Sequence, residues 1–210
     1  MRMTDLEPEY SSGGRAVLEL PGAEFHVTGI AGPSRGELDN VVFLNQVHGT
    51  SILQDPEGSE EGDGMILTRS GRYPGIRTAD CLPVFFWSRT FAAALHAGWR
   101  GIEGGIAGRM LRRLPRTPDF ILLGNCICRN CYTVGEDVRI RVAGASRAPG
   151  HPQGRIDLKL ALLDQLEEAG LPPDTAVFNM PECTCCGAAM FHSYRRDGTE
   201  KRNLQWLAVE

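Results

Sequence analysis

The sequence predicts an α+β fold, built from a mixed sheet or paired sheets flanked by helices. Segments with the composition of strands outnumber segments with helical periodicity, and turns rich in Gly and Pro separate many of them. Regular strand–helix alternation, which a parallel βαβ sheet would require, is rare. The 210 residues suit one large domain or a tightly fused pair.

Composition narrows the class of protein. Hydrophobic residues make up 42% and charged residues 23%, as in ordinary globular proteins. The net charge is −4 and no basic stripe occurs, so we expect no nucleic-acid partner. No apolar run approaches the roughly 18 residues of a spanning helix, so we expect no membrane partner. Residues 1–14 are polar and acidic, which predicts a loose leader rather than a secretory signal, and a cytoplasmic location.

The first third of the chain predicts short strands joined by turns. We expect strands at residues 16–20, 25–30, 41–47, 51–53, 65–68 and 76–78. The second half predicts three helices, at residues 101–114, from about 135, and at 157–169, where Asp157 is a plausible N-cap. Further strands are expected at residues 119–123, 175–178, 189–194 and 204–209.

The central stretch, residues 78–101, predicts a hairpin of strands 81–87 and 91–96. With Ser88 and Arg89 as a two-residue loop, Cys81 faces His96, with Cβ atoms about 5 Å apart. That spacing suits two ligands of one metal, since Zn–S is about 2.3 Å and Zn–N about 2.0 Å. A three-residue loop would place them on different faces. For this pair alone, a buried Cys and a hydrogen-bonded His are the more ordinary interpretation.

His48 is the third candidate ligand, because it ends a strand in NQVHG and Gly49 lets the chain turn away. Gln46 lies on the same face of that strand, two residues earlier. Together, His48, Cys81 and His96 form a His₂Cys set. Three protein ligands with an open fourth position are typical of catalytic zinc, whereas structural sites have four.

Ordered motif blocks extend beyond these three residues. They are NQVHGT (45–50), GDGMILT (62–68), TADCLPV (78–84), HAGWRG (96–101), CYTVGEDV (131–138), CTCC (183–186) and FHSYRRDG (191–198). The series resembles the laccase-domain family, once called multi-copper polyphenol oxidoreductases, whose members are regarded as zinc-dependent purine nucleoside phosphorylases; a bacterial branch is called peptidoglycan editing factor.

This resemblance covers about residues 41–200. It implies β-sheets stacked between helices (α/β/β/α layers), with residues 15–210 as a single laccase-type metal-binding domain. It implies that His48, Cys81 and His96 are the catalytic zinc ligands. It also implies phosphorolysis of adenosine, inosine, guanosine and methylthioadenosine, and hydrolytic deamination of adenosine. The expected partners are therefore purine nucleosides and phosphate, and a monomer or weak homodimer is expected.

Five further residues are candidates for substrate binding. Gln46 offers a donor and an acceptor for a base or ribose, and Asp63 could hold a ribose or carry a proton. Asp80 could orient a metal ligand, while Arg100 or Arg195 could hold phosphate. Each has a plain alternative, since an Asp-Gly turn or a solvated charge run needs no function.

Other functions remain open. Cys81 and His96 could form the nucleophile and base of a metal-free hydrolase or amidase. Hydrolytic editing of peptidoglycan precursors at the same site, or binding without catalysis, is a further possibility. Copper-dependent polyphenol oxidation is expected less than zinc chemistry, because five His are too few for a multi-copper centre.

Six more cysteines form two clusters, C-x-C-x-x-C at residues 126–131 and C-x-C-C at 183–186. They could bind a second, structural metal or sense redox state. Neither cluster has the paired C-x-x-C…C-x-x-C spacing of zinc modules, so we expect reduced thiols lining a packed corner.

Overall fold

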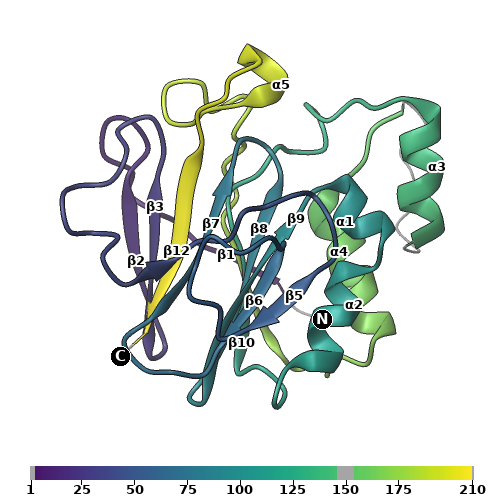
Figure 1. Cartoon of the computed structure of the whole chain (residues 1–210). Coiled ribbons are helices and arrows are strands. Elements are labelled where there is room, and N and C mark those ends of the chain that lie inside the picture. The colour runs from purple at the N-terminus through teal and green to yellow at the C-terminus, as the bar shows by residue number, and fades with distance from the viewer. Residues whose placement is uncertain (1–2, 146–153, 210) are drawn as a thin grey trace.

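Two mixed sheets stack face to face in the computed structural model, which describes residues 3–145 and 154–209 (Figure 1). The larger sheet has seven strands. Their spatial order is β1 (Met3–Asp5), β11 (Ala176–Asn179), β10 (Phe120–Leu123), β8 (Leu82–Ser88), β9 (Phe91–Ala97), β6 (Gly64–Leu67) and β5 (Ile52–Gln54). The smaller sheet has five. Their order is β2 (Ala16–Leu20), β3 (Ala23–Thr28), β12 (Asn203–Val209), β7 (Tyr73–Thr78) and β4 (Val41–Val42).

Helices cover the outer face of the larger sheet. They are α1 (Trp99–Glu103), α2 (Ile106–Arg113) and α4 (Leu158–Glu168), with α3 (Glu136–Ala145) packed outside them against α1 and α4, while the short α5 (Tyr194–Asp197) lies beyond the end of β12 (Figure 1). The expected cap of α4 is confirmed, because the Asp157 carboxylate accepts the N–H groups of Lys159 and Leu160. None of the helices in the described part of the chain has the length and apolar character needed to cross a bilayer.

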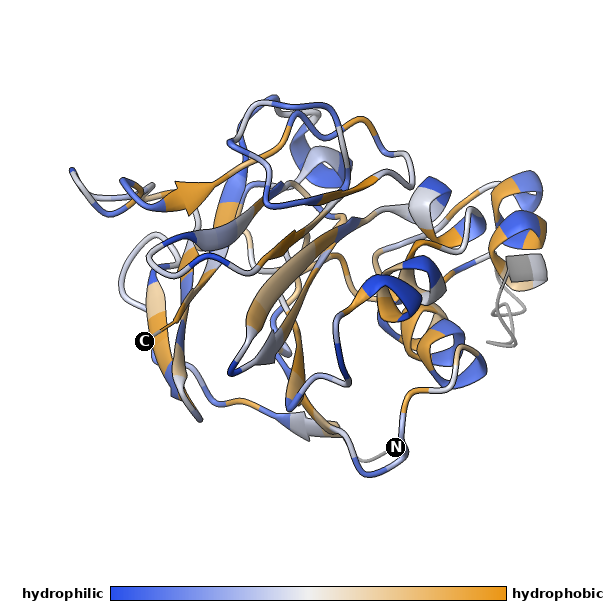
Figure 2. Cartoon of the chain, turned by 60° about the horizontal axis from the view of Figure 1, so that its bottom comes forward, coloured by the Kyte–Doolittle hydropathy of each residue, from blue (hydrophilic) through white to orange (hydrophobic). Residues whose placement is uncertain are grey.

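Strand alternation divides the interior into two cores. Val84 and Phe86 of β8 point toward the helices, while Phe85 between them points toward the smaller sheet. All three are buried, which explains why β8 reads as an unbroken apolar run. Hydrophobic residues accordingly concentrate along the central strands (Figure 2). The predicted α+β class, with stacked mixed sheets in one domain, is confirmed.

Four predicted elements differ in the structure. The helix expected at 101–114 is broken into α1 and α2, because Gly105 adopts a left-handed conformation with φ of 71°. The strand expected at 41–47 ends at Val42, since the following residues hydrogen bond to the 59–61 loop instead: the N–H of Ser59 donates to the Phe43 carbonyl, and that of Asn45 to the Glu60 carbonyl.

The other two differences concern the ends of the chain. Residues 189–194 were expected to form a strand but turn instead, with the N–H groups of Met190 and Phe191 donating to the Gly187 carbonyl. The leader, expected to be loose, contributes β1, which pairs in parallel with β11. Its three residues are exposed, so the strand had no apolar pattern by which to be recognised.

Candidate active site

His48, Cys81 and His96 converge at one end of the β8–β9 pair. His96 lies in β9, Cys81 directly precedes β8, and His48 follows β4 in a loop. Their ligand-type atoms lie within 4.8 Å of one another, and the two imidazole rings meet edge to face at 4.7 Å between centroids. His48 has a φ of 60°, a left-handed conformation that turns its side chain toward the other two.

The hairpin register differs from the predicted one by two residues. Ser88 pairs with Phe91, so the loop is Arg89-Thr90 and His96 faces Pro83 rather than Cys81. Because side chains alternate with a period of two, Cys81 still lies on the same face as Pro83. The prediction of direct pairing is wrong, while the shared face is retained.

Gly98 is the residue that gives the three ligands room. A Cβ at this position would lie 3.0 Å from Sγ of Cys81 and 3.4 Å from Cδ2 of His48. Neither atom could move away without disturbing the cluster. The glycine in HAGWRG therefore has a steric reason, since any side chain would enter the space where the ligands meet.

Asp63 is buried beneath the cluster, and its carboxylate hydrogen bonds to His96 and to the backbone around His48. Its Oδ1 lies 2.7 Å from Nδ1 of His96 and accepts the His48 N–H at 2.9 Å. Its Oδ2 accepts the N–H groups of Val47 and Gly49, at 3.3 and 2.7 Å. Because a carboxylate only accepts, Nδ1 of His96 carries a proton, and Nε2 is the ring nitrogen that faces the cluster.

These contacts shift the acidities of the site. Burial alone would raise the pKa of the Cys81 thiol, but hydrogen bonds from His48 and His96 lower it to about 6. Burial opposes the charge on His96, yet the Asp63 carboxylate and the Cys81 thiolate raise its pKa to about 9. Hydrogen bonds from His96 and the backbone lower the pKa of Asp63 despite its burial. The cluster thus favours a thiolate and a carboxylate at neutral pH.

The carboxylate of Asp80 is bound by residues of the segments around the His48–Cys81–His96 cluster. The hydroxyls of Thr184 and Ser193 and the N–H of Arg195 donate to its carboxylate, at 2.7, 3.0 and 2.7 Å. The N–H of Ile127 donates to its carbonyl at 3.0 Å. Its own φ of 102° is unusual for a residue with a side chain. Asp80 therefore orders the backbone beside Cys81.

A pocket of about 580 Å³ opens over the cluster. It is lined by His48, Cys81 and His96 together with Asn45, Gln46, Arg77, Thr78, Ala79, Asp80, Trp99, Arg100, Tyr132, Tyr194, Arg195 and Arg202. Four of the predicted substrate residues lie on this lining; Asp63 does not, since its side chain is buried beneath His96. Gln46 uses its amide to clamp the N–H and carbonyl of Arg77, at 2.9 and 2.8 Å.

Guanidinium groups give the pocket a positive rim. Arg100 stacks over Trp99 at 4.3 Å, and Arg195 lies 5.1 Å from the Tyr132 ring centroid. Arg77 and Arg202 complete the set. These two, with Tyr132 and Tyr194, were missed from the sequence, although the motif blocks CYTVGEDV and FHSYRRDG contain both tyrosines. Only the tertiary fold brings them to residues 48, 81 and 96.

Comparison with known proteins shows the family of the chain. Residues 31–210 match the family model described as multi-copper polyphenol oxidoreductase laccase. The chain is 32% identical over 200 residues to "Purine nucleoside phosphorylase YlmD" of Geobacillus stearothermophilus, covering 81% of this chain and 72% of that protein. It is 30% identical over 189 residues to "Adenosine deaminase RL5" of an unknown prokaryotic organism, covering 77% and 72%.

The fold agrees as well. The crystal structure of YlmD from Geobacillus stearothermophilus superposes with a TM-score of 0.79 at 26% sequence identity, covering 97% of this chain and 98% of that one. These matches confirm the resemblance carried by the motif blocks. The chain belongs to the multi-copper polyphenol oxidoreductase laccase family.

Proposed function

We propose that this protein is a zinc-dependent enzyme acting on purine nucleosides, by phosphorolysis and by hydrolytic deamination of adenosine. The observation that carries the proposal is the His₂Cys set at the base of an arginine-rimmed pocket. Relatives named for purine nucleoside phosphorolysis and adenosine deamination support the substrate class. Adenosine, inosine, guanosine and methylthioadenosine are the proposed substrates of phosphorolysis.

The donor set of this chain fits zinc. His48, Cys81 and His96 supply two imidazole nitrogens and one sulfur, all directed at one point and open on the pocket side. The Asp63 carboxylate fixes the tautomer of His96, as partners of zinc-bound imidazoles do. The chemistry that zinc supplies in such a site is Lewis-acid polarisation and a hydroxide available at neutral pH.

The donor set fits a multi-copper centre less well. Among the described residues, only His48 and His96 share a cluster of ligand-type atoms. His26 stacks on Trp206, and His192 hydrogen bonds through its backbone to Asn203. His151 lies outside the described residues. A coupled copper centre needs more imidazoles than this cluster brings together.

The rim of the pocket provides groups for phosphate and for a purine. Arg100 and Arg195 present guanidinium groups, which bind phosphate through charge-assisted hydrogen bonds. Trp99, Tyr132 and Tyr194 present aromatic surface on which a purine can stack. The Gln46 amide, at the edge of the pocket, offers its remaining donor and acceptor capacity to the ribose or base.

Two reactions would share this pocket. In phosphorolysis a phosphate oxygen bonds to the anomeric carbon, the glycosidic C–N bond breaks, and the base leaves with the electron pair and takes up a proton. In deamination a water oxygen bonds to C6 of adenosine and ammonia leaves, giving inosine. The arginines hold the phosphate in the first reaction and are not required by the second.

The experiment incubates the zinc-loaded protein with adenosine, with and without phosphate, and separates the products by chromatography. We expect adenine and ribose 1-phosphate when phosphate is present, inosine when it is absent, and loss of both after chelation. Turnover that survives complete metal removal would favour the alternative in which the Cys81 thiolate is a nucleophile and His96 its base. Absence of all products would reject nucleosides as substrates and direct the test to peptidoglycan precursors.

A further inference from the structure

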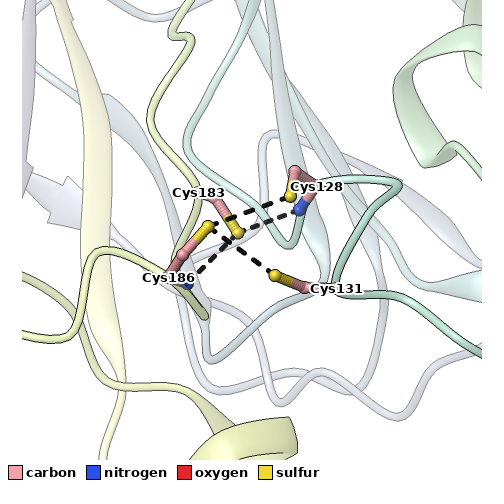
Figure 3. Close-up of side chains that lie close together, drawn as sticks. All are labelled: Cys128, Cys131, Cys183 and Cys186. Atoms are coloured by element: carbon pink, nitrogen blue, oxygen red, sulfur yellow. Dashed lines mark hydrogen bonds between the residues drawn. The ribbon is translucent and has the colours of Figure 1, made fainter.

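A second group of ligand-type side chains lies in the wall behind the pocket. The thiols of Cys128, Cys131, Cys183 and Cys186 all lie within 4.8 Å of one another (Figure 3). The argument from spacing against a metal here is wrong. Cys128/Cys131 and Cys183/Cys186 are both C-x-x-C pairs, and the extra cysteines 126 and 185 disguise them.

The sulfur positions match a tetrahedral ion. Sγ of Cys186 lies 3.6 Å from Sγ of Cys131 and 4.0 Å from Sγ of Cys128. A zinc ion bonded to four sulfurs at about 2.3 Å holds neighbouring sulfurs about 3.8 Å apart. A disulfide would bring two of them to about 2.05 Å, and all seven cysteines of the chain are free.

The backbone around Cys183 is arranged for a thiolate. Sγ of Cys183 accepts the N–H of Cys128 at 3.1 Å and that of Cys186 at 3.5 Å. Donated N–H groups stabilise a sulfur that carries negative charge. The two loops are also joined directly, because the N–H of Thr184 donates to the Cys126 carbonyl at 3.1 Å. This backbone hydrogen bond keeps the two cysteine loops side by side, whether or not their thiols bind a metal.

Positive charge lies close to both loops. Nη1 of Arg195 donates to the Cys131 carbonyl at 3.3 Å, and Nη1 of Arg196 to the Cys185 carbonyl at 2.8 Å. A zinc ion with four thiolates has a net charge of about −2, which the guanidinium group of Arg195 partly offsets, whereas that of Arg196 is already paired with Asp197 at 2.6 Å. Four neutral thiols at a partly exposed position would gain nothing from these cations.

We propose that Cys128, Cys131, Cys183 and Cys186 bind a structural zinc ion, separate from the His48–Cys81–His96 cluster. Four protein ligands close the coordination sphere, as structural sites require. The ion would join segments 55 residues apart in the sequence. It would also stabilise the pocket wall. Tyr132, which lines the pocket, directly follows Cys131. Thr184, which lies between Cys183 and Cys186, donates a hydrogen bond to Asp80.

The experiment compares the zinc content of purified variants by elemental analysis. We expect Cys128→Ser/Cys186→Ser to lose about one zinc per chain relative to wild type. Cys185→Ser is the matched control, because Cys185 lies in the same loop but outside the cluster, and it should keep the wild-type content. His48→Ala should keep the ion of the four-cysteine site whether or not nucleosides are substrates. Equal zinc in the double variant and in Cys185→Ser would overturn the proposal.

A second measurement on the unaltered chain covers the case in which the double variant fails to fold. Native protein is treated with a thiol-alkylating reagent before and after chelation, and the labelled peptides are identified by mass spectrometry. We expect Cys186, although exposed, to be protected until chelation and then labelled together with its three partners. Labelling of Cys186 at the same rate before and after chelation, a disulfide within the set, or iron in place of zinc would overturn the proposal.

Discussion

The Asp63 carboxylate lies 2.7 Å from Nδ1 of His96 and accepts the His48 N–H at 2.9 Å, so one buried acid positions two of the three ligands. In Asp63→Asn, the new NH₂ group cannot accept the backbone N–H groups that now point at the carboxylate. We expect zinc affinity at this site to fall about 10–100-fold. The fold should lose about 1–3 kcal/mol, because buried donors are left unsatisfied.

Competition titration with a chromophoric chelator measures the affinity in Asp63→Asn, and denaturant unfolding measures the stability. Asp119→Asn, at a partly exposed turn far from the pocket, is the control. Wild-type affinity in Asp63→Asn would show that the carboxylate does not position the ligands.

His48→Ala should abolish zinc binding at the His₂Cys site and nucleoside turnover while leaving the fold intact. His48 is exposed and contributes no apolar packing, so its removal should shift the thermal midpoint little. Leu95→Ala is the contrasting variant, since Leu95 is fully buried in β9 beside His96 and its truncation costs about 2–5 kcal/mol. Calorimetry and product chromatography check both. An active or an unfolded His48→Ala protein would contradict this assignment.

Gly98→Ala tests the steric argument. The added methyl would lie 3.0 Å from Sγ of Cys81, so we expect weaker zinc binding and reduced turnover in a folded protein. Gly144→Ala in α3 is the matched control, because a Cβ there meets nothing within 4 Å. Zinc content measures the loss of binding, and near-ultraviolet circular dichroism checks that the tertiary structure is retained. Unchanged zinc binding in Gly98→Ala would mean that the ligands adjust to the methyl group.

Arg100→Gln separates the two proposed reactions. We expect the KM for phosphate to rise at least about tenfold, since a charge-assisted hydrogen bond is worth about 1.5–3 kcal/mol. Deamination of adenosine in the absence of phosphate should be nearly unchanged. Arg89→Gln, in the turn at the other end of the hairpin, serves as control. Equal losses in both reactions would assign Arg100 to the nucleoside rather than to phosphate.

His26 predicts an acid-dependent loss of stability. Burial against Trp206 lowers its pKa below the ordinary value of 6.5, although Glu24 opposes this shift. The unfolded chain therefore binds this proton first as the pH falls, so folding loses free energy below about pH 6.5. Between pH 7.5 and pH 5, the thermal midpoint of wild type should fall further than that of His26→Gln. If the thermal midpoints of wild type and His26→Gln fell equally between these pH values, His26 would not be the cause of the loss of stability.

The pattern of strands predicts part of the His48–Cys81–His96 cluster, although His48 lies in the loop after β4 rather than at the end of a strand. Cys81 and His96 flank one apolar hairpin, and the period of two kept them on one face although the register was displaced by two residues. The residues of the pocket wall could not be predicted in this way. Tyr132 and Tyr194 belong to loops without periodicity, and only tertiary contacts bring them to the hairpin.

Two interpretations made from the sequence change once the fold is known. Asp63 looked like a turn residue that could reach substrate, but the fold buries it beneath His96. The four-cysteine cluster looked unpaired, because the two C-x-x-C pairs lie 55 residues apart and each has an extra cysteine nearby. Burial and long-range pairing depend on topology, which local pattern leaves undetermined.

The contacts of Asp80 have a consequence for the order in which contacts form during folding. Its carboxylate joins residues 104, 113 and 115 positions away, whereas Asp63 and His96 are only 33 positions apart. Closing a longer loop costs more entropy, and contacts distant in the chain form later. We therefore expect the contact of Asp63 with His96 to form before those of Asp80 with residues 184, 193 and 195, so that the part of the pocket wall carrying Tyr194 and Arg195 closes last.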